Sequence, residues 1–475
     1  MAALTGALAL SFLGCRPPRV GQAPDWPPIT FTSTDRVLIL APHPDDEVLG
    51  CGGIIQQAVP MRIPVRVVFF TYGDNNQWSF LVYRKHLVLT PIAVRRMGLV
   101  RHDEAVAAAH VLGLSDKDLT FFGYPDFGTL PIWNEHWGER PPFQSMLTRV
   151  RAVPYANALR PGAPYKGEEV LRDLEQVLRQ FQPTKVFVSH PGDHMPDHAA
   201  LYLFTRVALW DLAKEMSPEL YAYLLHFRHW PLPRGFRPSE PLEPPRPFRE
   251  PIVWRSHPLR PGEVERKRSA ITAHRTQYRS SAQYLLSFIR PNELFGDFPS
   301  LPLSFSASPV PLSADGHRAG SGPSRAPEQL TDEERAAFVG VEERLLRLEG
   351  QELVMSMRFS RPFAAAVGAS IFIFGYRGDR PFGQMPKIHV RLGRLGIDAT
   401  DQGRPLPKDT VIVHRGLKDI TVRLPLSILG APEKILTSAR TYLGEVPLDW
   451  VSWRILELPL SSGAAPRKET AGSGG

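Results

Sequence analysis

Cysteine is scarce in this chain: its 475 residues include two, Cys15 and Cys51. Two cysteines exclude a disulfide framework and a four-cysteine zinc site. The basic residues give a formal net charge of +8, but they are scattered and no aromatic residues alternate with them in a stripe. Nucleic acid is therefore disfavoured as a partner. Beyond the N-terminus, no stretch approaches the ~20 apolar residues of a membrane-spanning helix.

The N-terminus resembles a bacterial lipoprotein signal. MAALTGALALSFLGC is apolar up to Cys15, and a polar, proline-rich stretch follows it. The apolar core is short and no Lys or Arg precedes it, which leaves a disordered or mis-started N-terminus as the alternative. We expect residues 1–34 to be a signal and tether, with a lipid anchor at Cys15 and a location at the cell envelope. A cytoplasmic location is the alternative.

Residues 35–297 alternate strand-like and helix-like segments. Apolar strands are predicted at 36–41, 65–70, 119–126, 185–190 and 221–227, and helices at 47–59, 99–114, 168–181, 197–216 and 262–289. This alternation predicts an α/β fold, with a Rossmann-like, mostly parallel sheet and helices on both faces.

A different pattern follows this first domain. Residues 298–328 are rich in Ser, Pro, Gly and Ala, which predicts a flexible or extended linker. From 329 to 462 short segments, several alternating at period two, are separated by turn residues, as at 352–359 and 387–393. They predict a smaller all-β, sandwich-like domain. Residues 463–475 are expected to be a disordered tail.

Two polar clusters stand directly behind predicted strands. HPDDE, which begins at His43, follows the first strand, and HPGDHMPDH, from His190 to His198, follows the fourth. Ligand sites in open α/β sheets lie outside the carboxyl ends of the strands. Hydrolytic zinc sites typically take three ligands from His, Asp and Glu and leave one position for water. His43 and Asp46 can supply two ligands, and the second cluster can supply the third.

APHPDDEVLGCGG closely resembles the signature of the LmbE-like or PIG-L deacetylases, which are zinc-dependent N-deacetylases of N-acetylglucosaminyl compounds. Further motifs match in order: RHDEAVAAAHVLGL, FFGYPD, PGDHMPDHAAL and KRSAITAHRTQY. The resemblance covers about 35–295. It implies that His43, Asp46 and His198 bind Zn²⁺, that Asp45 is the general base for an activated water, and that Asp197 orients the ligands from behind.

The resemblance also implies that Arg101 approaches the substrate, with a simple surface pair between Arg101 and Glu104 as the alternative. Asp126 ends a predicted strand on the same face and is also expected at the substrate, with the capping of a turn as its alternative. The family often has a histidine three residues before its last ligand, where this chain has Met195. We therefore expect His194, or a neighbour in its loop, to stabilise the oxyanion, since one such donor is worth about 10²- to 10³-fold in rate. Glu47 is either a helix N-terminal carboxylate or a catalytic group, and Cys51 is expected to be a packing residue.

The leading hypothesis is a zinc hydrolase that removes the acetyl group of an N-acetylglucosamine-type amino sugar or conjugate. One alternative is a non-catalytic envelope glycan-binding protein that keeps the fold. The intact HPDD and PDH motifs argue against it, because binding alone has no need of Asp45. Another alternative is a metal amidase acting on a different acyl amide. The substrate is an amino sugar or glycan in the leading hypothesis, and protein partners are left open.

Overall fold

The computed structural model describes residues 26–75, 90–249, 252–305, 308–312, 330–363, 366–393, 396–444 and 446–459. The predicted lipid attachment at Cys15 lies outside these residues, as do most of the predicted linker and the whole of the predicted tail. None of the helices in these ranges is long and apolar enough to cross a membrane.

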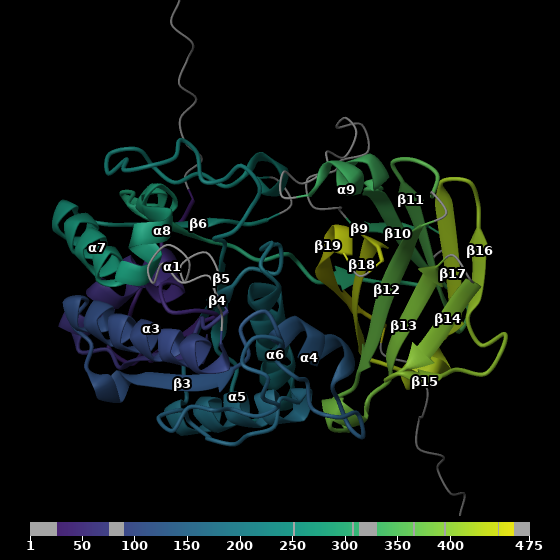
Figure 1. Cartoon of the computed structure of the whole chain (residues 1–475), viewed down its shortest axis with the longest axis horizontal. Helices are drawn as coiled ribbons and strands as arrows, with labels where there is room; N and C mark the ends of the chain where they lie inside the picture. Colours follow the sequence, from purple (N-terminus) through teal and green to yellow (C-terminus); the bar gives the residue numbers. More distant parts are fainter. Residues whose placement is uncertain are drawn as a thin grey trace, which may run out of the picture.

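A parallel five-stranded sheet forms the centre of the N-terminal domain (Figure 1). Its strands are β1 (Val37–Ala41), β2 (Val65–Thr71), β3 (Leu119–Tyr124), β4 (Lys185–Ser189) and β5 (Glu219–Tyr223), in the order β3-β2-β1-β4-β5. Because β1 pairs with both β2 and β4, the strand order reverses between β1 and β4. A crevice opens outside the carboxyl ends of the strands at such a reversal. The predicted α/β class is confirmed.

Helices cover both faces of this sheet. One hydrophobic cluster joins one face to α1 (Asp46–Ala58), α3 (Pro91–Val111) and α7 (Pro261–Ala273). Another joins the opposite face to α4 (Thr129–Glu135), α5 (Gly167–Phe181) and α6 (Pro196–Asp211). The single helix predicted over 262–289 is wrong: α7 ends at Ala273 and α8 spans Arg275–Leu285, because His274 between them has a non-helical backbone. A small antiparallel pair, β6 (Arg255–Pro258) and β7 (Asn292–Phe295), completes the domain.

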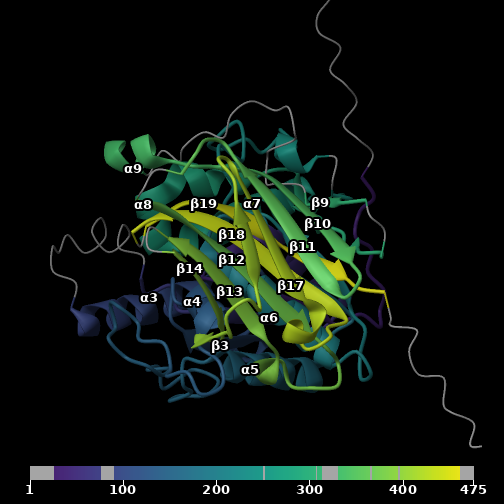
Figure 2. The ribbon, with the colours of Figure 1, turned by 90° about the vertical axis from the view of Figure 1, so that its right-hand side faces the viewer.

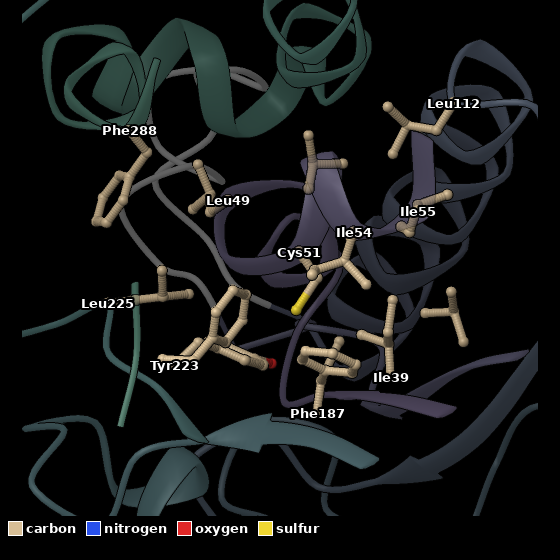
Figure 3. Close-up of a cluster of buried hydrophobic side chains, with 14 of the residues drawn as sticks. Ile39, Leu49, Cys51, Ile54, Ile55, Leu112, Phe187, Tyr223, Leu225 and Phe288 are labelled. Atoms are coloured by element: carbon tan, nitrogen blue, oxygen red, sulfur yellow. The ribbon is translucent and has the colours of Figure 1, made fainter. Parts of the chain in front are cut away.

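Helix α1 lies close against the sheet and presents Cys51 to it. The Cys51 side chain is fully buried, among Ile39, Ile54, Phe187 and Tyr223 (Figure 3). A Cβ atom on the neighbouring Gly50 would lie 2.6 Å from the Tyr223 ring. The glycines of this helix therefore permit its close approach, and the thiol acts there as a small packing group.

The C-terminal region is a sandwich of two sheets. The strands are β8 (Leu301–Pro302), β9 (Val310–Leu312), β10 (Val341–Glu349), β11 (Glu352–Phe359), β12 (Val367–Tyr376), β13 (Lys387–Gly393), β14 (Gly396–Asp401), β15 (Arg404–Pro405), β16 (Ile412–Arg415), β17 (Asp419–Pro425), β18 (Lys434–Leu443) and β19 (Val446–Glu457), with the short helix α9 (Asp332–Ala337). One sheet has the order β16-β17-β11-β10-β9 and the other has the order β15-β14-β13-β12-β18-β19-β8. The predicted all-β class of this region is confirmed. Strands β8 and β9 lie within the predicted linker, so the sandwich takes in part of that segment.

The sandwich packs directly on α4, α5 and α6, and seen from its own side its strands lie in front of the α/β domain (Figures 1 and 2). Strand β12 is buried along its whole length. Ile371 points into the sandwich core, whereas Phe374 joins the cluster that contains the sheet and α4. There the Trp133 ring lies 5.8 Å from Phe374 and 5.9 Å from Trp453. The two regions therefore share a continuous hydrophobic core.

Candidate metal centre

The two predicted polar clusters lie side by side at the reversal of strand order. β1 leads into His43, and α1 begins three residues later at Asp46. β4 leads into His190, and α6 begins at Pro196, so that His198 lies in its first turn. Because β1 and β4 are parallel neighbours, both loops leave the sheet at the same edge.

Three buried side chains converge between these loops. His43 Nδ1 lies 3.3 Å from Asp46 Oδ2, and His198 Nε2 lies 3.2 Å from the same oxygen. His43 is 6% exposed, Asp46 is 1% exposed and His198 is 0% exposed. Ligands of a tetrahedral zinc at bond lengths of about 2.1 Å lie about 3.4 Å apart, so this spacing suits one ion. Both ring nitrogens of His198 are buried and lack a well-directed hydrogen bond among the described residues, which also fits a metal ligand.

The other nitrogen of His43 faces two carboxylates. Its Nε2 lies 3.1 Å from Asp126 Oδ1 and 3.1 Å from Asp197 Oδ2. Asp197 also accepts the backbone N–H of Phe127 at 2.6 Å and that of Thr129 at 3.2 Å. A carboxylate behind a ligand histidine fixes the ring orientation and tautomer. A second possible set of ligands for an ion consists of His43, Asp126 and Asp197. The carboxylate of Asp197 already accepts two backbone N–H groups, which favours a role in orienting His43.

Asp193 stands behind His198 in the same way. Its Oδ2 lies 3.1 Å from His198 Nδ1 and accepts the backbone N–H of Leu225 at 3.1 Å and of His226 at 2.8 Å. Burial alone would raise the pKa of Asp193, but the neighbouring imidazoles and the backbone N–H of Met195 lower it to about 2. The sequence placed Asp193 in the second cluster without giving it a role, because its spacing does not show which imidazole it faces. With Asp126 and Asp197 behind His43, the site is rich in negative charge and suited to a cation.

Asp45 sits at the wall of the same site in a strained conformation. Its φ of 125° is unfavourable for a residue with a side chain and typical of functional positions. Its backbone N–H donates to Glu47 Oε2 at 2.9 Å, and Glu47 Oε1 lies 3.0 Å from His274 Nε2. Burial, with Asp46 and Glu47 nearby, raises the pKa of Asp45 to about 7, while Arg101 and His274 oppose the rise. Glu47 thus supports the backbone of Asp45 from within the protein.

Arg101 is buried beneath the first loop. Its guanidinium donates to the Pro44 carbonyl at 2.7 Å and to the Gly73 carbonyl at 2.8 Å, and it lies 3.5 Å from Asp45 Oδ1. Glu104, three residues on, accepts from the backbone N–H and the hydroxyl of Thr276 at 3.0 and 2.6 Å. The two residues therefore do not form a surface pair. Arg101 holds the loop that carries Asp45 and also reaches the site.

A cavity of about 440 Å³ opens onto this cluster. It is lined by His43, Asp45, Asp46, Leu49, Asn75, Arg101, Asp126, Phe127, Met195, His226, Gln277, Ser281, Tyr284 and Leu285. The volume lies in the usual range for small-molecule sites. His194 is not among these residues, and its ring packs against Phe227 at 4.9 Å. A larger hollow of about 750 Å³ at the boundary with the sandwich includes no histidine in its lining.

Residues 38–209 match the model of the PIG-L family, described as GlcNAc-PI de-N-acetylase. This part of the α/β domain, called the PIG-L domain below, is therefore similar to that family. The match spans both loops of the metal centre, and the resemblance carried by the sequence motifs is confirmed.

Two curated relatives match the PIG-L domain. One is 1D-myo-inositol 2-acetamido-2-deoxy-alpha-D-glucopyranoside deacetylase 1 of Saccharopolyspora erythraea, 28% identical over 38% of this chain and 55% of its own length. The other is a glucosamine-6-phosphate deaminase-like protein of Bacteroides thetaiotaomicron, 22% identical over 52% of this chain and 36% of its own length. The matches thus span about half or less of these relatives.

Solved structures also resemble the PIG-L domain. The N,N'-diacetylchitobiose deacetylase of Pyrococcus horikoshii is 20% identical, with a TM-score of 0.32, over 53% of this chain and 75% of that protein. The A40926 pseudoaglycone deacetylase is 16% identical, with a TM-score of 0.36, over 55% of this chain and 96% of that protein.

Proposed function

We propose that the PIG-L domain is a metal-dependent deacetylase that hydrolyses the N-acetyl group of an N-acetylglucosamine-type amino sugar or conjugate. The convergence of His43 Nδ1 and His198 Nε2 on Asp46 Oδ2 carries this proposal. We propose zinc as the metal, because two imidazoles and a carboxylate are ligands of hydrolytic zinc sites. The name of the Saccharopolyspora relative, a deacetylase of a 2-acetamido sugar, supports the substrate class.

Zinc held by His43, Asp46 and His198 would lower the pKa of a water in the cavity and polarise the amide carbonyl. Asp45 lies in the cavity wall, where its carboxylate can accept a proton from the attacking water. The water oxygen bonds to the carbonyl carbon and the C–N bond breaks. Asp45 returns the proton to the leaving nitrogen, so that acetate and the free amine result. Arg101 keeps Asp45 in place through the Pro44 carbonyl.

The test combines metal content with acetate release from a panel of N-acetylated amino sugars, using the full chain. We expect about one zinc per chain in the native protein, consistent with one three-ligand site. Asp45→Asn should keep the metal and lose about 10²- to 10⁴-fold in kcat, the usual loss for a general base. His198→Ala should lose both metal and activity. His110→Ala is the matched control, because His110 is exposed on α3 and does not line the cavity.

Two outcomes would contradict the proposal. Zinc binding without acetate release from any amino sugar would show that the site acts on a different amide. Failure of the native protein to retain zinc after loading and dialysis would refute the metal centre itself.

A further inference from the structure

The loop between β3 and α4 brings one exposed aromatic ring to the cavity. Phe127 lines the cavity and is 42% exposed. Tyr284 and His226 also line it, but their rings stack on each other at 5.5 Å, and the Arg234 guanidinium lies 5.3 Å from the centre of the Tyr284 ring. Phe127 therefore offers an aromatic surface that remains available to a ligand.

The backbone of Phe127 has a conformation that normally favours glycine. The N–H of Gly128 donates to the Pro125 carbonyl at 2.9 Å, which closes a four-residue turn with Phe127 at its third position. The φ of Phe127 is 58°, and a turn with positive φ at this position usually has glycine or asparagine there. A bulky side chain in the left-handed region costs free energy, and such strain is concentrated at functional sites. Since the residue is exposed, packing within the fold does not explain why phenylalanine occupies the position.

The same turn is fixed to the metal centre by its backbone. The Phe127 N–H donates to Asp197 Oδ2 at 2.6 Å, and this oxygen lies 3.1 Å from His43 Nε2. Helix α4 begins at Thr129, whose N–H donates to Asp197 Oδ1 at 3.2 Å. This helix packs between α6 and the sandwich (Figure 1). The position of Phe127 relative to the metal centre is therefore set before a ligand arrives.

We propose that Phe127 is a specificity-determining residue whose ring stacks on the apolar C–H face of a pyranose, so that the site selects cyclic amino sugars over acyclic amides. The inference rests on the proposed amide hydrolysis. A pyranose carries hydroxyl groups at its edge and C–H groups on its faces, and an aromatic ring can remove such a face from water. Because the acetamido nitrogen is bonded to the sugar ring, a carbonyl held at the metal centre leaves that ring in the same cavity, whose wall includes Phe127.

Steady-state kinetics of the zinc-loaded full chain compare two substrates with the same amide: methyl N-acetylglucosaminide, which has a pyranose ring, and N-acetylethanolamine, which has none. Phe127→Ala should raise KM for the pyranoside about 10-fold with little change in kcat, because the stacked ring binds the ground state and the transition state alike. The preference for the pyranoside, measured as the ratio of the two kcat/KM values, should fall by the same factor; an unchanged ratio would overturn the proposal. Phe127→Tyr, which keeps the flat ring, should retain the native KM. Phe236→Ala is the matched control, because Phe236 is 41% exposed and lies outside the cavity lining.

Thermal unfolding separates a binding role from a packing role. Phe127→Gly removes the ring and permits the positive φ, so the relief of strain offsets the greater chain entropy of glycine, and Tm should stay within about 2 °C of the native value. Its KM for the pyranoside should nevertheless rise about 10-fold, as for Phe127→Ala. Arg149→Gly is the control for strain alone and should keep the native KM, because Arg149 has the same φ of 58°, is exposed and does not line the cavity. A fall in Tm of more than about 2 °C for Phe127→Gly would identify the ring as a packing group and overturn the proposal.

Calorimetric titration with methyl N-acetylglucosaminide separates this inference from the proposed function, because binding does not depend on turnover. If the native protein releases acetate and Phe127→Ala keeps the native KM for the pyranoside, the role of Phe127 is refuted and the deacetylase proposal stands. If no amino sugar is hydrolysed, the deacetylase proposal fails, and the titration then decides the role of Phe127. Binding about 10-fold weaker by Phe127→Ala would support that role, and equal affinity, or no binding by the native protein, would refute it.

Discussion

The shared core of the two regions predicts that they unfold as one unit, and Phe374→Ala tests this. Phe374 is fully buried and its ring lies 5.2 Å from Trp453 and 5.8 Å from Trp133 of α4. Truncating a buried phenylalanine to alanine costs about 3–5 kcal/mol in unfolding free energy. Unfolding entropy is about 2.1 cal/mol/K per residue, so a unit of about 400 residues loses about 4–5 °C in Tm for 4 kcal/mol.

Ile371→Ala is the matched control, because Ile371 is equally buried on the same strand but faces the core of the sandwich. If the regions unfold together, scanning calorimetry of the metal-free protein should show one transition that both variants lower by a few degrees. If the sandwich unfolds alone, as a unit of about 130 residues, the same calculation gives a shift of about 15 °C for Ile371→Ala. Two transitions, with Phe374→Ala affecting neither, would refute the shared core.

Three other predictions concern the metal centre, the domain boundary and the N-terminus. Asp193→Asn should weaken zinc binding by about 10- to 100-fold in a chelator competition, because it removes the carboxylate behind His198 Nδ1; unchanged affinity would contradict this. Burial raises the pKa of Asp211 to about 6. Between about pH 4 and 6 the folded state therefore binds more protons at this carboxyl than the unfolded state does, and the contribution of Asp211 to the free energy of unfolding falls as the pH rises through that window. Asp211→Asn, which keeps an acceptor for the Tyr376 hydroxyl, should therefore gain about 1–2 kcal/mol over the native protein at pH 7 and nothing at pH 4 in urea unfolding. We also propose that the chain is exported and lipidated; Cys15→Ser should then abolish incorporation of labelled fatty acid, and label retained by this variant, or absent from the native protein, would contradict the proposal.

The order of the α/β elements could be predicted because each buried parallel strand is a short apolar run and each helix carries apolar residues at helical spacing. The place of the site followed from the same pattern, since His43 lies in the loop behind β1 and His198 lies in the first turn of the helix that follows β4, both at the carboxyl edge of the sheet. The break at His274 could not be predicted, because helical periodicity continues across it while the side chain contacts Glu47, a residue far away in the sequence.

Only the tertiary structure decided which groups face one another. Sequence spacing placed Asp193 and Asp197 near His198, yet Asp197 reaches His43 and Asp193 reaches His198. Asp193 lies in the loop before α6, whereas Asp197 lies in the first turn of that helix. The register of β4 against β5 brought His226 beside the loop 194–195, and no local pattern contains that register.

The packing of the sandwich was likewise decided by the tertiary structure. The run of apolar residues in β12 indicates that both faces of the strand are buried. It does not indicate that Trp133 and Trp453 cover one of these faces. The sequence by itself determined most elements of the α/β domain, the loops that carry the polar clusters and the resemblance to the family, because local periodicity and short motifs encode these features. Packing between distant segments determined the partners of each ionisable side chain and the attachment of the second region, because contacts across the fold depend on register and shape that no short stretch of sequence contains.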